Sequence, residues 1–186
     1  STFKPIVYTT AIDRGFTPVS VFLDEAVSFE AGPNQPPYEP MNYDRKFLGP
    51  ITLRSALEQS RNIPAVKAML EVGPQQVVDY SARFGLRGNF QPYLSLALGA
   101  AETTLLDATA AYSVFPNRGV RMTPYSIVSI ADRDGNILEQ NRPQARKAIR
   151  ADSAFVMANL LRGVIQHGTG RAAASLDWPL GGKTGT

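Results

Sequence analysis

The hydrophobic positions of this chain recur mostly at helical spacing. In residues 1–14 the apolar side chains fall three and four positions apart, which predicts a buried helix. Ser1 and Lys4 then lie one turn apart on the same helix face. Thr52 and Asp152 stand where helix caps are favoured. The same spacing predicts further helices over residues 52–60, 63–72, 75–84, 104–115 and 152–166.

Strand signals are fewer. Residues 125–140 alternate between apolar and polar positions on both sides of Asp134-Gly135, a pattern typical of a β-hairpin. We expect one short strand around 19–23, and the start of another over 180–186. The predicted fold class is therefore α/β and rich in helix, with a central sheet that these residues leave incomplete.

Prolines interrupt the periodic pattern between residues 18 and 50. Six of them fall in this stretch: Pro18, Pro33, Pro36, Pro37, Pro40 and Pro50. We expect a long, mostly irregular excursion over the surface. Loops of this length are uncommon unless they line a site.

The composition fits about one domain and excludes several kinds of chemistry. The 186 residues are 44% hydrophobic, with a net charge of +3 and scattered basic residues, so we expect no nucleic-acid partner. The absence of cysteine excludes disulfides and thiolate chemistry. His167 is the only histidine, and its place at a predicted helix end favours contact with free carbonyl groups over catalysis. No apolar run is long enough to predict a transmembrane helix.

Three short motifs carry the candidate chemistry. They are Ser1-Thr2-Phe3-Lys4, Ser60-Arg61-Asn62 and Lys183-Thr184-Gly185, which read S-x-x-K, S-x-N and K-T-G. Each of the first two is expected about once by chance in a chain of this length. Their order and spacing together make coincidence a weak explanation.

The residue types in these motifs suit acyl transfer. Ser1 is a candidate nucleophile, and Lys4 can act as its base if burial and a nearby cation lower the lysine pKa. Lys183 would be that cation. Ser60 offers a hydroxyl between the two amines that could pass a proton to a leaving group.

Other residues of the motifs suit an extended peptide substrate. The Asn62 amide can donate and accept hydrogen bonds. Thr184 and Thr186 lie two apart, so their hydroxyls could hold a terminal carboxylate, while Gly185 lets the backbone approach closely. The main-chain N–H groups of Ser1 and Thr186 are the expected oxyanion donors.

The sequence resembles the transpeptidase domain of penicillin-binding proteins, in particular the bifunctional class A group. Beyond the three motifs, the resemblance rests on Gly49-Pro50-Ile51-Thr52-Leu53-Arg54-Ser55-Ala56-Leu57, Leu98-Gly99-Ala100-Ala101-Glu102-Thr103-Thr104-Leu105-Leu106, Asn117-Arg118-Gly119 and Gly168-Thr169-Gly170. It covers essentially the whole chain and implies the penicillin-binding-protein/β-lactamase-like fold over residues 1–186.

This resemblance implies a D,D-transpeptidase that cross-links peptidoglycan. The nucleophile attacks the D-Ala-D-Ala end of a stem peptide, and an amine of a neighbouring stem captures the acyl-enzyme. β-Lactams acylate the same serine. The implied catalytic residues are Ser1, Lys4, Ser60 and Lys183, and the implied substrate-binding residues are Asn62, Thr184, Gly185 and Thr186. No metal or organic cofactor is implied.

The resemblance also implies a larger parent protein. Class A members carry a membrane anchor and a glycosyltransferase domain and act at the periplasmic face of the inner membrane. Cell-wall regulators are expected as possible partners of such a protein. We expect the present chain to be a partial domain, truncated at both ends. Such a fragment should be poorly stable and weakly active or inactive, an expectation that a cooperative thermal transition above about 45 °C would contradict.

Three alternatives stay open at this point. A D,D-carboxypeptidase differs only in using water as the acceptor. A class A β-lactamase would carry S-D-N, where this chain has Arg61, and a separate Glu-x-x-x-Asn; Glu58 has that spacing to Asn62 but overlaps the S-x-N turn. A non-enzymatic β-lactam sensor shares the motifs and would differ in releasing no D-alanine.

Overall fold

The computed structural model describes residues 1–30 and 36–185 of the chain. The α-helices in this part are α1 (Lys4–Asp13), α2 (Leu53–Glu58), α3 (Asn62–Val72), α4 (Pro74–Phe84), α5 (Leu105–Ser113) and α6 (Ala151–Gln166). Two 3₁₀ helices are η1 (Leu94–Leu98) and η2 (Arg171–Ser175). The strands are β1 (Val21–Asp24), β2 (Gly49–Thr52), β3 (Val120–Met122), β4 (Ser129–Ala131), β5 (Ile137–Gln140) and β6 (Ala145–Lys147).

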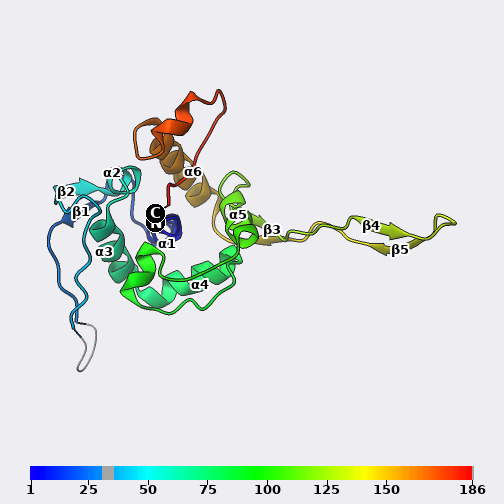
Figure 1. Cartoon of the computed structure of the whole chain (residues 1–186), viewed down its shortest axis with the longest axis horizontal. Coiled ribbons are helices and arrows are strands. Elements are labelled where there is room, and N and C mark those ends of the chain that lie inside the picture. Colours follow the sequence, from blue (N-terminus) through cyan, green and yellow to red (C-terminus); the bar gives the residue numbers. More distant parts are fainter. Residues whose placement is uncertain (31–35, 186) are drawn as a thin grey trace.

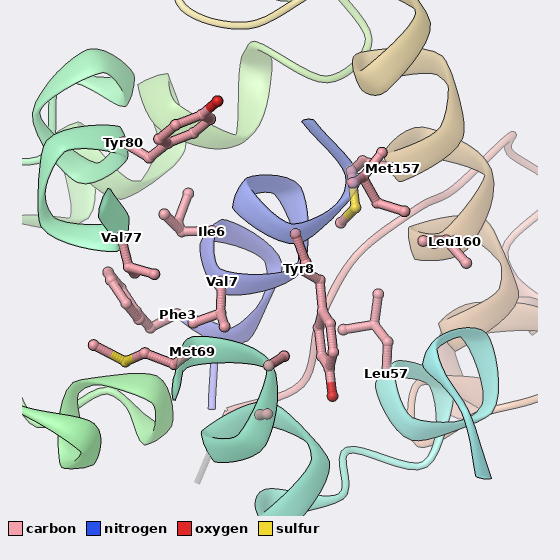
Figure 2. Close-up of a cluster of buried hydrophobic side chains, with 14 of the residues drawn as sticks. Phe3, Ile6, Val7, Tyr8, Leu57, Met69, Val77, Tyr80, Met157 and Leu160 are labelled. Carbon is pink, nitrogen blue, oxygen red and sulfur yellow. The ribbon is translucent and has the colours of Figure 1, made fainter. Parts of the chain in front are cut away.

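Helix α1 forms the centre of the fold, with α2, α3, α4 and α6 around it (Figure 1). Every residue from Lys4 to Ile12 is buried. Figure 2 shows side chains of the surrounding helices packing against those of α1. The helix places two threonines in this core, and each hydroxyl donates to a carbonyl one turn earlier, Thr9 to Pro5 O (2.6 Å) and Thr10 to Ile6 O (2.9 Å). The apolar pattern therefore places the first motif in the protein interior.

The helices begin and end close to the predicted boundaries, with one corrected cap. The Thr52 hydroxyl accepts from Ser55 N (3.2 Å) and caps α2 as expected. Asp152 does not cap α6, because the helix begins at Ala151 and Arg150 is the residue before it. Asp152 instead lies in the first turn, where a negative charge still favours the helix N-terminus.

The strands in the described ranges form three separate two-stranded antiparallel sheets: β1 with β2, β3 with β6, and β4 with β5. The β4–β5 pair encloses Asp134-Gly135, in the region where the alternation indicated a hairpin, and it extends far from the helices (Figure 1). No local pattern predicted β2, β3 or β6.

The expected strand over 180–186 is wrong for its described part. Residues 180–185 are irregular, because a strand requires a hydrogen-bonded neighbour and no described residue forms a ladder with them. The segment is instead attached to α6, where Gly182 N donates to Leu161 O (3.1 Å).

The proline-rich excursion is partly anchored. Its two ends form β1 and β2, and Phe29 pairs with Tyr38 in an isolated bridge. Asp24 and Asn42 are both buried. Expectations for residues 31–35 lie outside the described part of the chain. Across that part, no helix is both long and apolar enough to cross a membrane.

Candidate active site

The three motifs meet beside the N-terminal end of α1. Ser1 precedes the helix, Lys4 is its first residue, Ser60 lies in the turn between α2 and α3, and Lys183 approaches along α6. Each motif contributes residues to the lining of a cleft with a volume of about 400 Å³. Its lining consists of Ser1, Asn42, Tyr43, Asp44, Gln59, Ser60, Arg61, Asn62, Leu98, Thr169, Thr184 and Gly185.

Lys4 is fully buried and donates three hydrogen bonds toward the second motif. Its Nζ lies 2.6 Å from Ser60 O, 2.6 Å from Asn62 Oδ1 and 3.2 Å from Ser60 Oγ. Burial lowers the pKa of Lys4 to about 7, with smaller contributions from the positive charges of Lys183 and Arg61. A lysine with this pKa is available as a neutral amine near neutral pH.

Lys183 approaches the same serine hydroxyl from the other side. Its Nζ donates to Ser60 Oγ at 2.7 Å and to the main-chain oxygen of Thr184 at 3.0 Å. Burial lowers the pKa of Lys183 to about 8. The Ser60 hydroxyl thus lies between two lysine amines, which is the arrangement that a proton relay requires.

Ser60 adopts a backbone conformation that L-residues avoid. Its φ is +57°, in the left-handed region. Residues held there carry a strain of roughly 1–3 kcal/mol and cluster at functional sites. The turn is fixed on both sides, by Ser60 N donating to Leu57 O (3.1 Å) and Arg61 N to Ala56 O (2.9 Å). This conformation presents both the carbonyl and the hydroxyl of Ser60 to Lys4.

Ser1 and Asn62 have partners that the sequence did not indicate. Ser1 N donates to Leu98 O at 2.9 Å. Within the described part, no hydrogen bond joins the Ser1 hydroxyl to Lys4, which is turned toward Ser60 instead. The Asn62 side chain donates to Met41 O (2.6 Å) while its oxygen accepts from Lys4.

The third motif lines the opposite wall of the cleft. The Thr184 and Thr169 hydroxyls lie 2.7 Å apart, and Lys183 Nζ is 3.3 Å from the Thr184 hydroxyl. A Cβ on Gly185 would lie 3.1 Å from Thr2 Cγ2, so a larger residue would crowd the first motif. Thr186 lies outside the described residues, so its pairing with Ser1 as oxyanion donor stays a prediction.

The sequence-based prediction missed several residues at the cleft. Arg61 was noted only as a departure from S-D-N, although its position between Ser60 and Asn62 was a usable signal. Thr169 entered the sequence analysis only as part of the Gly168-Thr169-Gly170 block, with no role at the site. Asp24 and Asn42 carry no local signal, since they approach the site through folding of the chain.

No other candidate chemistry emerges from the described residues. Residues 1–30 and 36–185 contain no group of three acidic or histidine side chains that could hold a metal ion. His167 ends α6, where its main-chain N–H donates to Gly163 O at 2.8 Å.

Comparison with known proteins finds relatives over the full length of the chain. Penicillin-binding protein 1A of Neisseria meningitidis serogroup B is 40% identical over 194 residues, covering 100% of this chain and 24% of the relative. Its counterpart from Aquifex aeolicus is 38% identical over 186 residues, covering 100% of this chain and 26% of the relative. The chain thus spans about a quarter of the length of the curated relatives it matches.

Solved structures share the fold. The crystal structure of penicillin-binding protein 1A from Haemophilus influenzae superposes with a TM-score of 0.92 at 30% identity, covering 100% of this chain and 34% of that one. The D,D-transpeptidase domain of a peptidoglycan glycosyltransferase from Eggerthella lenta gives 0.82 at 25% identity, covering 100% and 52%. These matches confirm the predicted fold.

The sequence model of the penicillin binding protein transpeptidase domain matches residues 1–186. This match, the relatives at about 40% identity and the shared fold agree with the convergence of the three motifs on one cleft. The chain therefore belongs to the penicillin-binding protein transpeptidase domain family.

Proposed function

We propose that this chain carries the site of a D,D-transpeptidase that joins peptidoglycan stem peptides through an acyl-serine intermediate. The observation that carries the proposal is the Ser60 hydroxyl between Lys4 Nζ and Lys183 Nζ, beside Ser1 in one cleft. Both amines have lowered pKa values, so the site can accept and return protons near neutral pH.

In the first half-reaction, the Ser1 hydroxyl oxygen attacks the carbonyl carbon between the two D-alanines. Neutral Lys4 accepts the serine proton, for which its amine turns from Ser60 and Asn62 toward Ser1. A bond forms between the carbonyl carbon and the serine oxygen, and the amide C–N bond breaks. Ser60 passes a proton from the lysines to the leaving amine, and D-alanine departs.

The carboxylate of the departing residue needs cationic and hydroxyl donors. Thr184 and Thr169, which line the cleft, would provide the hydroxyls, and Lys183, whose Nζ donates to the Thr184 hydroxyl, would provide the cation. Thr186 is assigned to the same role. On the opposite wall, Asn62 would exchange its bond to Met41 O for one to the peptide main chain. A penicillin carries both an amide carbonyl and a carboxylate and is bound in the same way.

In the second half-reaction, the amine nitrogen of another stem peptide attacks the ester carbon. A C–N bond forms, the C–O bond to Ser1 breaks, and the amine's proton passes through Lys4 to the Ser1 oxygen. A carboxypeptidase would use water at this step. A β-lactamase needs an additional base to activate water. Among the described lining residues, Asp44 is the one carboxylate, and it is paired with Arg61 at 2.9 Å. This pairing favours a long-lived acyl-enzyme.

The domain's place in the cell is part of the same proposal. Stem peptides and β-lactams are its proposed partners, and the relatives named penicillin-binding protein 1A support an extracytoplasmic site of action. Docking by cell-wall regulators is proposed on the resemblance to class A proteins alone.

Intact-mass spectrometry after mixing the chain with a penicillin tests this function, with Ser1→Ala as the matched control. We expect a stable adduct of the chain that maps to Ser1 and is absent from the variant. D-Alanine release from an acyl-D-Ala-D-Ala peptide then separates an enzyme from a sensor. Rapid penicillin turnover without an adduct would instead assign a β-lactamase. A chain that unfolds in a cooperative thermal transition, and is therefore folded, yet forms no adduct and turns over no penicillin would refute the proposal.

A further inference from the structure

A buried arginine links the S-x-N turn to two segments far away in sequence. Arg61 Nε donates to Asp24 Oδ2 at 2.9 Å, at the end of β1. Its two terminal nitrogens donate to Asp44 Oδ2, at 2.9 Å, and to Lys46 O. The Arg61 side chain is 7% exposed and Asp24 is fully buried. One guanidinium thus joins three parts of the chain.

A second set of bonds closes a ring around this contact. Asn42 Nδ2 donates to Asp24 Oδ1 (2.7 Å) and to Lys46 O (2.9 Å). Asn42 Oδ1 accepts from the main-chain N–H of Asn62 at 2.8 Å. Asp24 is thereby connected to Arg61 directly and to Asn62 through Asn42. We refer to Asp24, Asn42, Asp44 and Arg61 as the clamp.

The clamp acts on the two residues that flank Arg61. Ser60 occupies a left-handed conformation that its surroundings have to maintain, and Asn62 N–H is held by Asn42. The planar guanidinium bonds in three directions at once, which a lysine ammonium on its flexible stem cannot reproduce with the same geometry. Asn42, Tyr43 and Asp44 also line the cleft, so the clamp fixes part of its wall.

We propose that Arg61 is a positioning residue for acyl transfer, which holds the Ser60 hydroxyl and the Asn62 amide in reacting position by bonding their turn to β1 and to residues 41–46. The inference rests on the proposed function. Arg61 itself touches no reacting atom, and it acts through its two neighbours. A displacement of about 1 Å at such groups lowers a reaction rate by up to about a hundredfold.

The rate of penicillin acylation, measured together with the fraction of chains acylated at saturation, tests this role. Arg61→Lys retains the charge beside Lys4 and loses the three-way geometry. We expect its acylation rate constant to fall by roughly tenfold or more, while the acylated fraction at saturation stays near that of the unmodified chain. Arg87→Lys is the matched control, since Arg87 pairs with Asp107 through two nitrogens, away from this cleft.

A double-mutant cycle identifies the route of the effect. If Arg61 acts through Asn62, the loss from Arg61→Lys is smaller in an Asn62→Ala background, so the two effects are not additive. Asp44→Asn is a milder perturbation that keeps the buried Asp24–Arg61 pair and serves if Arg61→Lys fails to fold. We expect it to lower the acylation rate constant by roughly two- to threefold.

Three results would overturn the inference. They are an unchanged rate constant in Arg61→Lys and Asp44→Asn, a reduced acylated fraction with an unchanged rate constant, or full additivity with Asn62→Ala. The second result would assign Arg61 to fold stability alone. Failure of the unmodified chain to form any adduct, although it is folded by its thermal transition, would instead refute the proposed function, and the inference with it.

Discussion

Removing the charge of Lys183 should raise the pH at which the site becomes active. Lys4 Nζ and Lys183 Nζ lie 3.2 Å and 2.7 Å from the same Ser60 oxygen, so the two nitrogens are within about 6 Å of each other. The pKa of Lys183 is about 8, so it is largely charged while Lys4 titrates near 7. Its positive charge disfavours protonation of Lys4.

The size of the effect follows from this separation. Two unit charges about 6 Å apart repel by about 0.7 kcal/mol at the dielectric constant of water and by about 3 kcal/mol at an effective value of about 20. These energies correspond to about half a pKa unit and about two units. Lys183→Gln should therefore raise the pKa of Lys4 by about half a unit to about two units. Burial, the larger cause of the low pKa, is unchanged by this substitution and still lowers it.

The assay is the rate constant of penicillin acylation between about pH 5 and pH 9. Because only neutral Lys4 can accept the Ser1 proton, the rate constant should rise with pH to a plateau, and the midpoint of the rise should lie near the Lys4 pKa of about 7. Lys183→Gln should move this midpoint upward, whatever its effect on the maximal rate. Lys147→Gln, on exposed β6, is the matched control. A midpoint that stays in place or moves downward in Lys183→Gln would refute the reasoning.

Three further substitutions test separate parts of the structure. Thr184→Val removes a hydroxyl from the proposed carboxylate site without changing the side-chain volume, and we expect penicillin acylation efficiency to fall by roughly tenfold, with an unchanged efficiency contradicting the assignment. Met157→Ala leaves a cavity in the buried face of α6 and should lower the free energy of unfolding in urea by about 2–5 kcal/mol. Thr52→Ala removes the cap of α2 and should cost about 1 kcal/mol in the same measurement, whereas a change near zero would show that Ser55 N finds another acceptor.

The local elements of the fold were predictable because their signals are local. Apolar spacing predicts the helices at 62–72 and 74–84. Gly73-Pro74 separates the two helices, and Gly85, in the left-handed conformation, ends α4. The S-x-x-K, S-x-N and K-T-G motifs identified Ser1, Ser60 and Lys183 as residues of one site. In the structure Ser1 and Ser60 line one cleft, and Lys183 Nζ donates to Ser60 Oγ. Their catalytic roles remain predictions.

The parts that sequence reasoning missed depend on long-range contacts. Nothing local indicates that Asp24 lies against Arg61, because 37 positions separate them and neither has a distinctive neighbourhood. Strand β2 could not be predicted from its own residues for the same reason, since it is defined by its pairing with β1. Alternation alone predicted a strand at 180–186, where the described residues attach to α6 instead.

The projecting hairpin has a consequence for how the molecule opens. The strands of β4 and β5 are exposed along their whole length and bury no core (Figure 1). A two-stranded hairpin without a packed face is only marginally stable in water. Its amide protons should therefore exchange with solvent through local opening, many times faster than those of α1. The hairpin and the helical body form two cooperative units, so replacing Ile130 to Ile137 by a short turn should leave the thermal midpoint of the body unchanged.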